Sequence, residues 1–271
     1  MIHLIVTDLD GTLLTPDHQL LPFSAATLRA VATSGRQLVI ASGRPWRDVS
    51  HFRNALDLPM MLITSNGARV HDQSGHLLFR HDLPSSVVAE LLALDTPPEF
   101  HLNLYVDDEW LVVDDYPELL AFYTASGFGY RRLDRDQLPL KGVAKLFWVG
   151  PPELLNQWQQ QLELHFGKNI HAVFSNRDCL EVMAAGVSKG EALQVVLDSH
   201  GLDANQVMAF GDGLNDLEML KAVGHPRLMA NADPRLVTQL PGAQQIGHCR
   251  DQAVAVYLQQ WLAENEALTQ S

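Results

Sequence analysis

The sequence predicts an α/β fold: a parallel-sheet core that carries an inserted α+β module. Short apolar runs alternate with helix-like segments in the first third of the chain and again after Gly186, a rhythm typical of βαβ units. Between about Leu83 and Gly186, short strand-like pieces are mixed with longer helices, which indicates a separate module. A chain of 271 residues has room for two domains. We therefore predict a core formed by residues 1–82 and 187–271, and an inserted module at residues 83–186.

The first third of the chain contains the clearest strand and helix patterns. The apolar run at residues 3–7 predicts a short buried strand, and Gly35 ends the first predicted helix. A turn around Gly75 separates two short strand-like segments, which predicts a hairpin. The expected order is a strand at 3–7, a helix at 25–34, a strand at 37–41, a helix at 46–56, a strand at 60–64 and a hairpin at 68–79.

The insert and the last third continue the series. The insert has Pro-containing loops at residues 95–99 and 138–142, between its predicted elements. Its expected strands are 102–106, 110–113, 144–149 and 170–174, and its expected helices are 85–94, 117–125 and 152–165. After the insert we expect helices at 189–199, 215–222 and 251–263, and strands at 206–210, 227–230 and 244–246.

Composition narrows the function classes. The formal net charge of -13 argues against general binding to nucleic acids or anionic membranes, because both require clustered Lys and Arg. No apolar run approaches the roughly 20 residues that cross a bilayer, and no signal peptide is visible. Two distant cysteines, Cys179 and Cys249, do not form a disulfide framework. We expect a cytoplasmic protein with reduced thiols.

The segment from Asp8 to Thr12 is the most informative motif. Asp8 and Asp10 follow the first predicted strand, so both carboxylates can face the crevice in which α/β sheets bind ligands. Two crowded carboxylates favour a hard divalent cation such as Mg²⁺, and a carboxylate here can also act as a nucleophile that forms an aspartyl-phosphate. Gly11 permits a tight turn. The alternative interpretation is an ordinary Asp-Gly turn after a strand.

Three further clusters follow at predicted strand ends or helix starts. Ser42 and Gly43 end the second strand and suit a phosphate, although an ordinary strand-to-helix turn has the same residues. Lys189 opens the helix after the insert, where it could neutralise a phosphoryl group or simply be solvated. The segment from Gly211 to Asp216 could complete a hard-metal site, or Asp212 or Asn215 could cap a helix.

Together these motifs resemble those of the haloacid dehalogenase (HAD) superfamily, and within it the Cof-type phosphatases. The resemblance covers the whole chain, and a tail around His248 and Cys249 is similar to that of members acting on a pyrimidine pyrophosphate precursor of thiamin. It implies a Rossmann-like parallel-sheet core with an inserted cap of the C2B class. The motifs that carry it are residues 8–12, 42–44, 64–67, 186–190 and 211–216.

The resemblance implies roles for the acidic residues. Asp8 would be the nucleophile and a Mg²⁺ ligand, and Asp212 a further ligand. Asp10 would be the general acid/base, with its backbone carbonyl on the metal, and this acid role requires a raised pKa that the neighbouring Asp8 would promote. Asp216 and Thr12 would support the metal ligands without touching the metal.

The phosphoryl group would be held by a second set of residues. Ser42 and Lys189 would contact its oxygens, together with the backbone N–H groups of Leu9 and Gly43. Asn215 would contact the phosphate or orient Lys189.

Substrate contacts are expected from Arg44, Asn66 and Glu181. For each of these side chains, a purely structural role is an equal alternative.

The implied activity is Mg²⁺-dependent hydrolysis of small phosphorylated metabolites such as sugar phosphates, pyridoxal phosphate or cofactor-precursor phosphates. The alternatives are a phosphomutase and a catalytically weak metabolite-binding regulator. We expect a monomer or small homo-oligomer whose partner is the phosphorylated metabolite, with no nucleic acid and no membrane.

Overall fold

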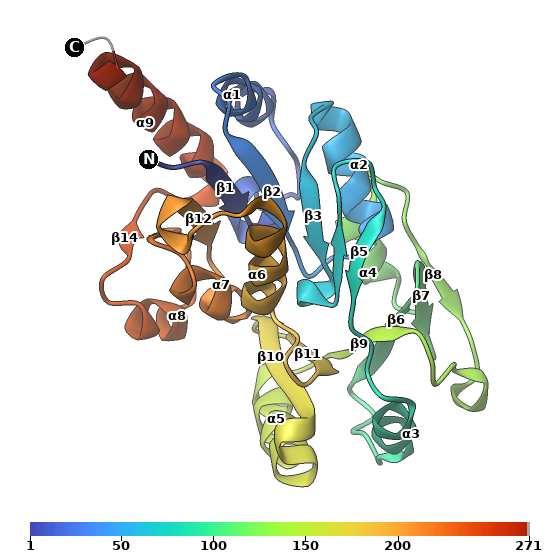
Figure 1. Cartoon of the computed structure of the whole chain (residues 1–271). Coiled ribbons are helices and arrows are strands. Elements are labelled where there is room, and N and C mark those ends of the chain that lie inside the picture. Colours follow the sequence, from blue (N-terminus) through green and yellow to red (C-terminus); the bar gives the residue numbers. More distant parts are fainter. Residues whose placement is uncertain (270–271) are drawn as a thin grey trace.

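The computed structural model of the chain describes residues 1–269 and contains two sheets, one above the other in Figure 1. The larger sheet has eight strands in the order β14-β13-β12-β1-β2-β3-β4-β5. The six strands from β14 to β3 run parallel, and β4 and β5 are antiparallel at one edge. Its strands are β1 (Leu4–Thr7), β2 (Gln37–Ala41), β3 (Met61–Thr64), β4 (Arg69–His71), β5 (Leu77–Arg80), β12 (Val207–Gly211), β13 (His225–Leu228) and β14 (Gln244–Gln245).

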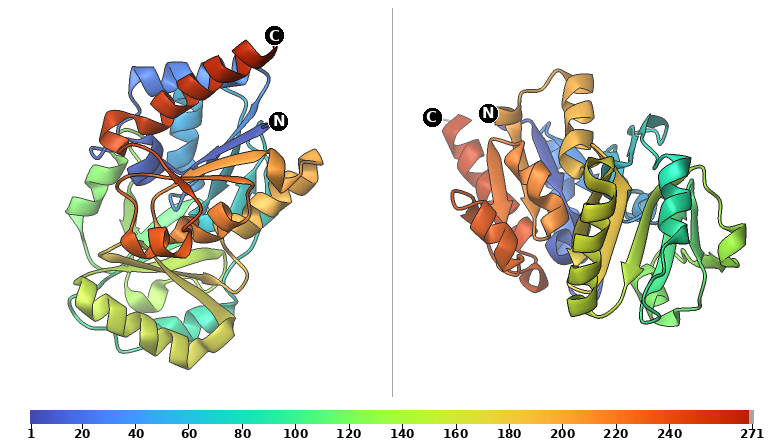
Figure 2. Two further views of the ribbon diagram at one scale, coloured as in Figure 1. Left: turned by 90° about the vertical axis from the view of Figure 1, so that its left-hand side faces the viewer. Right: turned by 90° about the horizontal axis from the view of Figure 1, so that it is seen from below.

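Helices cover both faces of this sheet, because its central strands are apolar on both sides. Ile5 of β1 belongs to the cluster with α1, α2 and α9, whereas its neighbours Leu4 and Val6 belong to the cluster with α6, α7 and α8. Figure 2 shows the resulting layers edge-on. The helices are α1 (Pro22–Thr33), α2 (Trp46–Leu56), α6 (Lys189–His200), α7 (Leu217–Lys221), α8 (Pro234–Gln239) and α9 (Ala253–Thr269).

The second sheet is built from the chain between β5 and α6. Its order is β10-β11-β9-β6-β7-β8, with antiparallel pairs except for β7 and β8. Helices α3 and α5 pack on one face through residues such as Leu91 and Trp158. The elements are α3 (Ser85–Ala93), β6 (His101–Val106), β7 (Glu109–Val112), α4 (Pro117–Leu120), β8 (Tyr130–Arg132), β9 (Val143–Val149), α5 (Pro152–Phe166), β10 (Ile170–Asn176) and β11 (Cys179–Ala184).

The predicted α/β class with a central parallel sheet is confirmed, and most predicted elements are present. The strand at 37–41 and the helix at 46–56 have the predicted bounds. Among the strands and α-helices of the described residues, β8, β11 and α8 were not predicted. The expected strand at 227–230 begins two residues earlier, and the expected helix at 117–125 is a four-residue helix followed by a 3₁₀ turn at Ala121–Tyr123.

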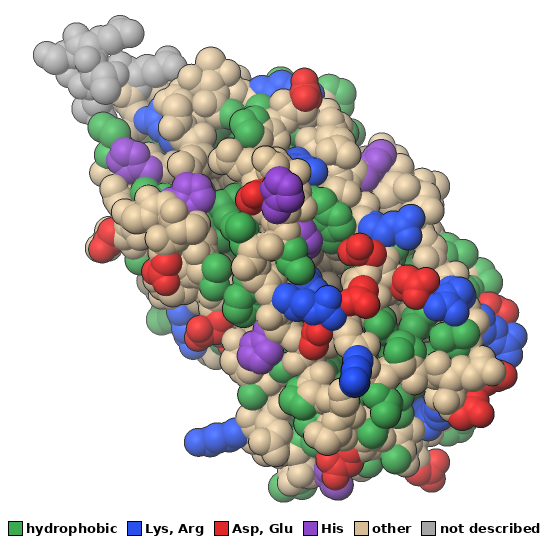
Figure 3. Space-filling model, turned by 45° about the vertical axis from the view of Figure 1, so that its right-hand side comes forward, with side chains coloured by type: hydrophobic (Ala, Val, Ile, Leu, Met, Phe, Trp, Pro, Cys, Tyr) green, Lys and Arg blue, Asp and Glu red, His purple; other side chains and the backbone are tan. Residues whose placement is uncertain are grey.

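The surface agrees with the acidic composition. On the face shown in Figure 3, Lys and Arg side chains are interspersed with Asp and Glu and do not gather into one basic patch. None of the helices in the described part of the chain is both long and apolar enough to cross a membrane.

Candidate active site

The predicted motifs meet at one edge of the larger sheet. Strand β1 lies between β12 and β2, and Thr7 is paired with both Phe210 and Ile40, so the carboxyl ends of the three strands are adjacent. Asp8, Ser42 and Asp212 each follow one of these strands directly. After Asp8 the chain turns sharply over Leu9–Leu13, a turn that Gly11 permits with φ of +77°.

Lys189 and three carboxylates form the centre of the site. Lys189 is fully buried, and its Nζ donates to Asp8 Oδ1 and to Asp216 Oδ1, both at 2.6 Å. Carboxylate oxygens of Asp8, Asp212 and Asp216 lie within 4.8 Å of one another. One lysine cannot balance three carboxylates, so this donor set fits a hard divalent cation such as Mg²⁺.

Burial and mutual repulsion shift the protonation of this cluster. Burial raises the pKa of Asp8 to about 7; Lys189 opposes this effect, and Asp216 and Asp10 add to it. Burial, together with Asp8 and Asp216, also raises the pKa of Asp212 well above its ordinary value. Burial alone would lower the pKa of Lys189, but its two carboxylate partners raise it, so the ammonium stays charged. A bound divalent cation would replace the protons on these carboxylates.

Neighbouring polar groups fix the orientation of Asp212 and Asp216. Thr12 Oγ1 donates to Asp212 Oδ1 at 2.8 Å. The second oxygen of Asp216 accepts the backbone N–H groups of Asp212 at 2.9 Å and Gly213 at 3.0 Å. Gly213, not Asp212 or Asn215, is the residue that precedes the first turn of the following helix.

Asn231 is a site residue that the sequence reasoning missed. Its Nδ2 donates to Gly11 O at 2.7 Å and to Asp212 Oδ2 at 3.3 Å, and its Oδ1 accepts the backbone N–H of Cys249 at 3.0 Å. The signal that could have found it is its position shortly after β13, at the same edge of the sheet.

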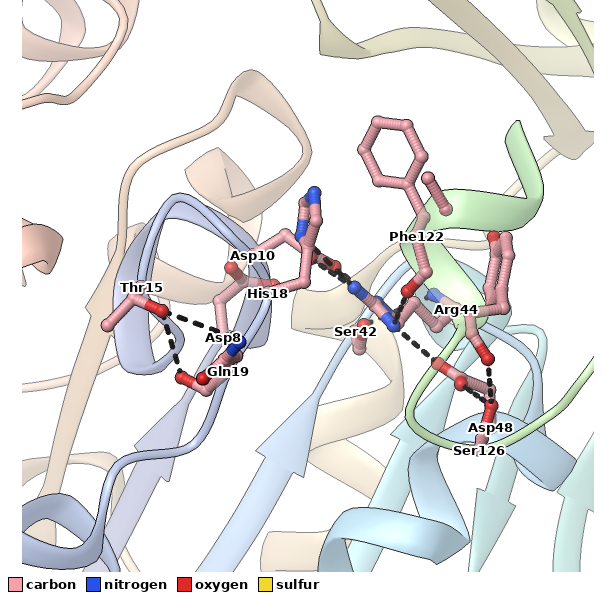
Figure 4. A network of polar contacts seen from close by, with 12 residues as sticks. Asp8, Asp10, Thr15, His18, Gln19, Ser42, Arg44, Asp48, Phe122 and Ser126 are labelled. Carbon is pink, nitrogen blue, oxygen red and sulfur yellow. Dashed lines mark hydrogen bonds and ion pairs between the residues drawn. The ribbon is translucent and has the colours of Figure 1, made fainter. Parts of the chain in front are cut away.

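Asp10 contacts Arg44 instead of joining the carboxylate cluster (Figure 4). Arg44 Nε donates to Asp10 Oδ2 and Arg44 Nη2 to Asp10 Oδ1, both at 2.6 Å, and His18 Nδ1 lies 2.8 Å from Asp10 Oδ1. Burial would raise the pKa of Asp10, but the Arg44 charge and these hydrogen bonds outweigh it and lower the pKa. The expectation of a raised Asp10 pKa is therefore wrong for this state, because Arg44 points at Asp10.

The predicted phosphate-binding residues follow the carboxyl ends of β1, β2 and β12 or begin α6. Ser42 is buried, and its Oγ accepts the backbone N–H of Arg44 at 3.1 Å. Leu9 is also buried, whereas Gly43 and Asn215 line the cavity described below.

The expected substrate contacts Asn66 and Glu181 are joined to each other. Asn66 Oδ1 accepts from Asn215 Nδ2 at 3.0 Å, and Asn66 Nδ2 donates to Glu181, which also pairs with Lys145. Both ends of the Asn66 amide are thus engaged with protein groups. Lys145 was missed, although a lysine within the apolar segment of β9 is an unusual feature; its Nζ lies 4.7 Å from the ring centroid of Tyr105.

A cavity of about 430 Å³ lies between the site and the second sheet. It is polar where it meets the larger sheet, and its opposite wall combines aromatic side chains with charged and polar ones. The core side contributes Asp8, Asp10, Gly43, Arg44, Asp212 and Asn215, and the second sheet and its loops contribute Tyr105, Trp110, Phe122, Tyr123, Lys145, Phe147 and Glu181. His248 and Cys249 also line it, in a 3₁₀ turn in which His248 Nδ1 accepts the Arg250 backbone N–H at 3.1 Å.

This arrangement can be compared with known families. The family model for haloacid dehalogenase-like hydrolases matches residues 5–258. The chain belongs to this family. Two HMP-PP phosphatases, from Escherichia fergusonii and from Escherichia coli strain K12 / DH10B, are each 41% identical to this HAD-like hydrolase over 262 residues, or 97% of this chain and 96% of theirs.

Solved structures share the fold of this HAD-like hydrolase. A haloacid dehalogenase-like hydrolase from Bacteroides thetaiotaomicron matches with a TM-score of 0.82 at 25% identity, covering 96% of this chain and 99% of that one. A sugar phosphatase of HAD subclass IIB matches with a TM-score of 0.81 at 17% identity, covering 95% and 98%. The second likeness, at this identity, concerns the fold alone.

Proposed function

We propose that this HAD-like hydrolase is a Mg²⁺-dependent phosphatase that hydrolyses small phosphorylated metabolites through an aspartyl-phosphate on Asp8. The observation that carries the proposal is the group of Asp8, Asp212, Asp216 and Lys189, of which Asp8 and Asp212 line a cavity of about 430 Å³. The carboxylates can bind a divalent cation, and the cation together with Lys189 can then neutralise the charge of a phosphoryl group. The names of the 41% identical relatives support the same class, and HMP-PP is one substrate to test.

Asp8 and Asp212 would hold the cation through their carboxylates, with the backbone carbonyl of Asp10. When bound, Mg²⁺ supplies charge neutralisation at the transferring phosphoryl group. Asp216 holds Lys189 in place by accepting a hydrogen bond of 2.6 Å from its Nζ. The second oxygen of Asp216 accepts the backbone N–H of Asp212 and thereby fixes the turn that carries the Asp212 carboxylate. Thr12 restrains the Asp212 carboxylate.

The chain's own residues carry out the two steps. Asp8 Oδ attacks phosphorus in line, a new O–P bond forms, and the bond to the leaving oxygen breaks while Asp10 protonates that oxygen. For this step Asp10 must carry a proton taken up from solvent, which requires that Arg44 first release one of the two Asp10 oxygens that it holds in the structure. Lys189, Ser42 and the backbone N–H groups of Leu9 and Gly43 bind the phosphoryl oxygens, with Asn215 beside them. Asp10 then accepts a proton from the water that attacks the aspartyl-phosphate, which releases inorganic phosphate and restores Asp8.

Residues 83–186 would act as the C2B-type cap over a core of residues 1–82 and 187–271. A cavity of about 430 Å³ lies within the size range typical of small-molecule sites. Closure of this cap would exclude bulk water and select the leaving group, with Glu181 and Lys145 on the cap wall of the cavity.

The test is phosphate release from a panel of phosphorylated metabolites, with and without Mg²⁺. Wild type, Asp8→Ala and the control Asp198→Ala, an exposed carboxylate on α6, would be compared. We expect Mg²⁺-dependent release that disappears only in Asp8→Ala. Conversion of a sugar phosphate into an isomer without phosphate release would indicate a mutase, and ligand binding without either reaction would indicate a regulator.

A further inference from the structure

The side chain of Asn231 joins three turns at the same edge of the larger sheet. Its Nδ2 donates to the carbonyl oxygen of Gly11 at 2.7 Å and to Asp212 Oδ2 at 3.3 Å, and its Oδ1 accepts the backbone N–H of Cys249 at 3.0 Å. These partners are 220, 19 and 18 residues away in the sequence. One amide group therefore links the turn after β1, the turn after β12 and the 3₁₀ turn that precedes α9.

The partners of Asn231 allow only one orientation of its amide group. A backbone N–H can only donate a hydrogen bond, and a backbone carbonyl can only accept one. The oxygen of the amide must therefore face Cys249, and its NH₂ group must face Gly11 and Asp212. A flipped amide would lose all three hydrogen bonds, so Asn231 is a fixed donor to the Asp212 carboxylate.

The backbone around Asn231 is attached to the segment that carries Asp212. The Met229 N–H donates to the Gly211 carbonyl at 3.2 Å, and the Asp233 N–H donates to the Asp212 carbonyl at 2.9 Å. These two hydrogen bonds lie on either side of Asn231 in the sequence. Its side chain is thus held at a defined place beside Asp212, as a group that orients another side chain must be.

Both oxygens of the Asp212 carboxylate accept a hydrogen bond from an uncharged donor. Thr12 Oγ1 donates to Oδ1 at 2.8 Å, and Asn231 donates to Oδ2. Each carboxylate oxygen has two lone pairs, so each keeps one that can face a cation. Because the donors carry no charge, they restrain the direction of the carboxylate and leave its negative charge available to the cation.

We propose that Asn231 is a positioning residue that fixes the direction of the Asp212 carboxylate and thereby makes the cation site prefer Mg²⁺ over the larger Ca²⁺. The inference rests on the proposed function, in which Asp212 holds the cation. Mg²⁺ demands near-ideal octahedral geometry, whereas Ca²⁺ accepts six to eight oxygen ligands in flexible arrangements. A carboxylate that is free to turn therefore weakens Mg²⁺ binding more than Ca²⁺ binding.

The test is isothermal titration calorimetry of the metal-free full chain with Mg²⁺ and, separately, with Ca²⁺. Groups that orient metal ligands typically contribute about 10- to 100-fold in metal affinity, so Asn231→Ala should raise the Kd for Mg²⁺ about 10-fold or more. The Kd for Ca²⁺ should rise less, so that the ratio of the Ca²⁺ to the Mg²⁺ Kd falls about threefold or more. A loss of folded protein would lower the number of sites and leave both Kd values unchanged.

Two further variants complete the test. Asn231→Ser keeps a polar side chain in the loop, but its single hydroxyl cannot donate to Gly11 and Asp212 together, so it should shift the ratio in the same direction as Asn231→Ala. Asn156→Ala is the matched control. The Asn156 amide also donates to a backbone carbonyl, that of Pro152 at 2.6 Å, but on the exposed surface of α5, and its loss should change neither Kd.

The outcomes separate this inference from the proposed function. If wild type binds neither ion, the cation site of the proposed function fails. If wild type binds Mg²⁺ and the Asn231 variants keep both wild-type Kd values, the inference is refuted while the cation site stands. A rise of both Kd values by the same factor would also refute it, because Asn231 would then hold the site together without selecting between the ions. If Asn231→Ala does not fold, Asn231→Ser against Asn156→Ala decides the question.

Discussion

Replacing Lys189 by Met tests the charge balance at the centre of the site. Lys189 is fully buried, and its Nζ is 2.6 Å from both Asp8 and Asp216. Met has a similar length without the charge, so Lys189→Met leaves three neighbouring carboxylates with no cation. In the metal-free protein, these carboxylates must then either bind extra protons or repel one another, and both effects lower the stability of the folded state.

The expected magnitude follows from this geometry. Breaking a buried ion pair by removing one partner destabilises by about 3–5 kcal/mol. For a chain of this size each kcal/mol lowers the Tm by roughly 2–4 °C, so the Tm in a chelator should fall by about 10 °C. Added Mg²⁺ should raise the Tm of the variant more than that of wild type, because the cation neutralises the same carboxylates.

Activity should not recover with stability. Lys189 is proposed to bind the transferring phosphoryl group, and loss of such a group lowers kcat by about 100- to 1,000-fold even with Mg²⁺ present. The assay is thermal unfolding followed by circular dichroism, together with phosphate release. The control is Lys221→Met, which removes an exposed lysine at the end of α7. Equal melting temperatures for Lys189→Met and wild type in chelator would refute the reasoning.

Three further predictions concern the same site. Gly11→Ala places a Cβ 2.2 Å from Asp212 Oδ2 and should abolish the Mg²⁺-induced rise in Tm. The control Gly35→Ala shares a positive φ, +85°, but its Cβ meets no atom within 4 Å, so this variant should keep the rise. Calorimetry with and without Mg²⁺ distinguishes the two variants. The Mg²⁺-induced rise in wild-type Tm should be smaller below pH 7 than above it. Burial raises the pKa of Asp8 to about 7, so below this pH a proton must leave Asp8 before the cation binds. Thermal unfolding with and without Mg²⁺ at several pH values measures this difference. Lys145→Met should destabilise by about 3 kcal/mol in urea unfolding, because Glu181 is left buried without its cation, and no change would contradict it.

Local sequence patterns were sufficient to predict the parallel strands of the larger sheet and the motifs that follow them. Apolar strands followed directly by Asp8, Ser42 and Asp212 place these residues at one edge, because parallel strands in a βαβ series share that edge. The missed elements have weak local signals. Strand β8, Tyr130–Arg132, has two arginines and lies at the edge of its sheet, and β11, Cys179–Ala184, has the charged Glu181 in the middle of an otherwise apolar segment.

The role of Arg44 could not be predicted because it depends on long-range contacts. Its partners Asp10 and Phe122 are 34 and 78 residues away in sequence. The sequence identified Arg44 as a residue near the crevice, but the direction of its guanidinium is set together by Asp10, Asp48 and the Phe122 carbonyl. For the same reason the lowered pKa of Asp10 could not be foreseen, since Asp8 was its only visible neighbour.

The central claim is that Asp8 becomes phosphorylated during turnover. The most direct measurement is rapid acid quenching of the enzyme with Mg²⁺ and a reactive phosphate ester, followed by mass spectrometry of the peptide that contains Asp8. The account predicts that this peptide gains the mass of one phosphoryl group in wild type and none in Asp8→Asn. Substrate turnover by Asp8→Asn at the wild-type rate, or a phosphoryl group on a different residue, would contradict it.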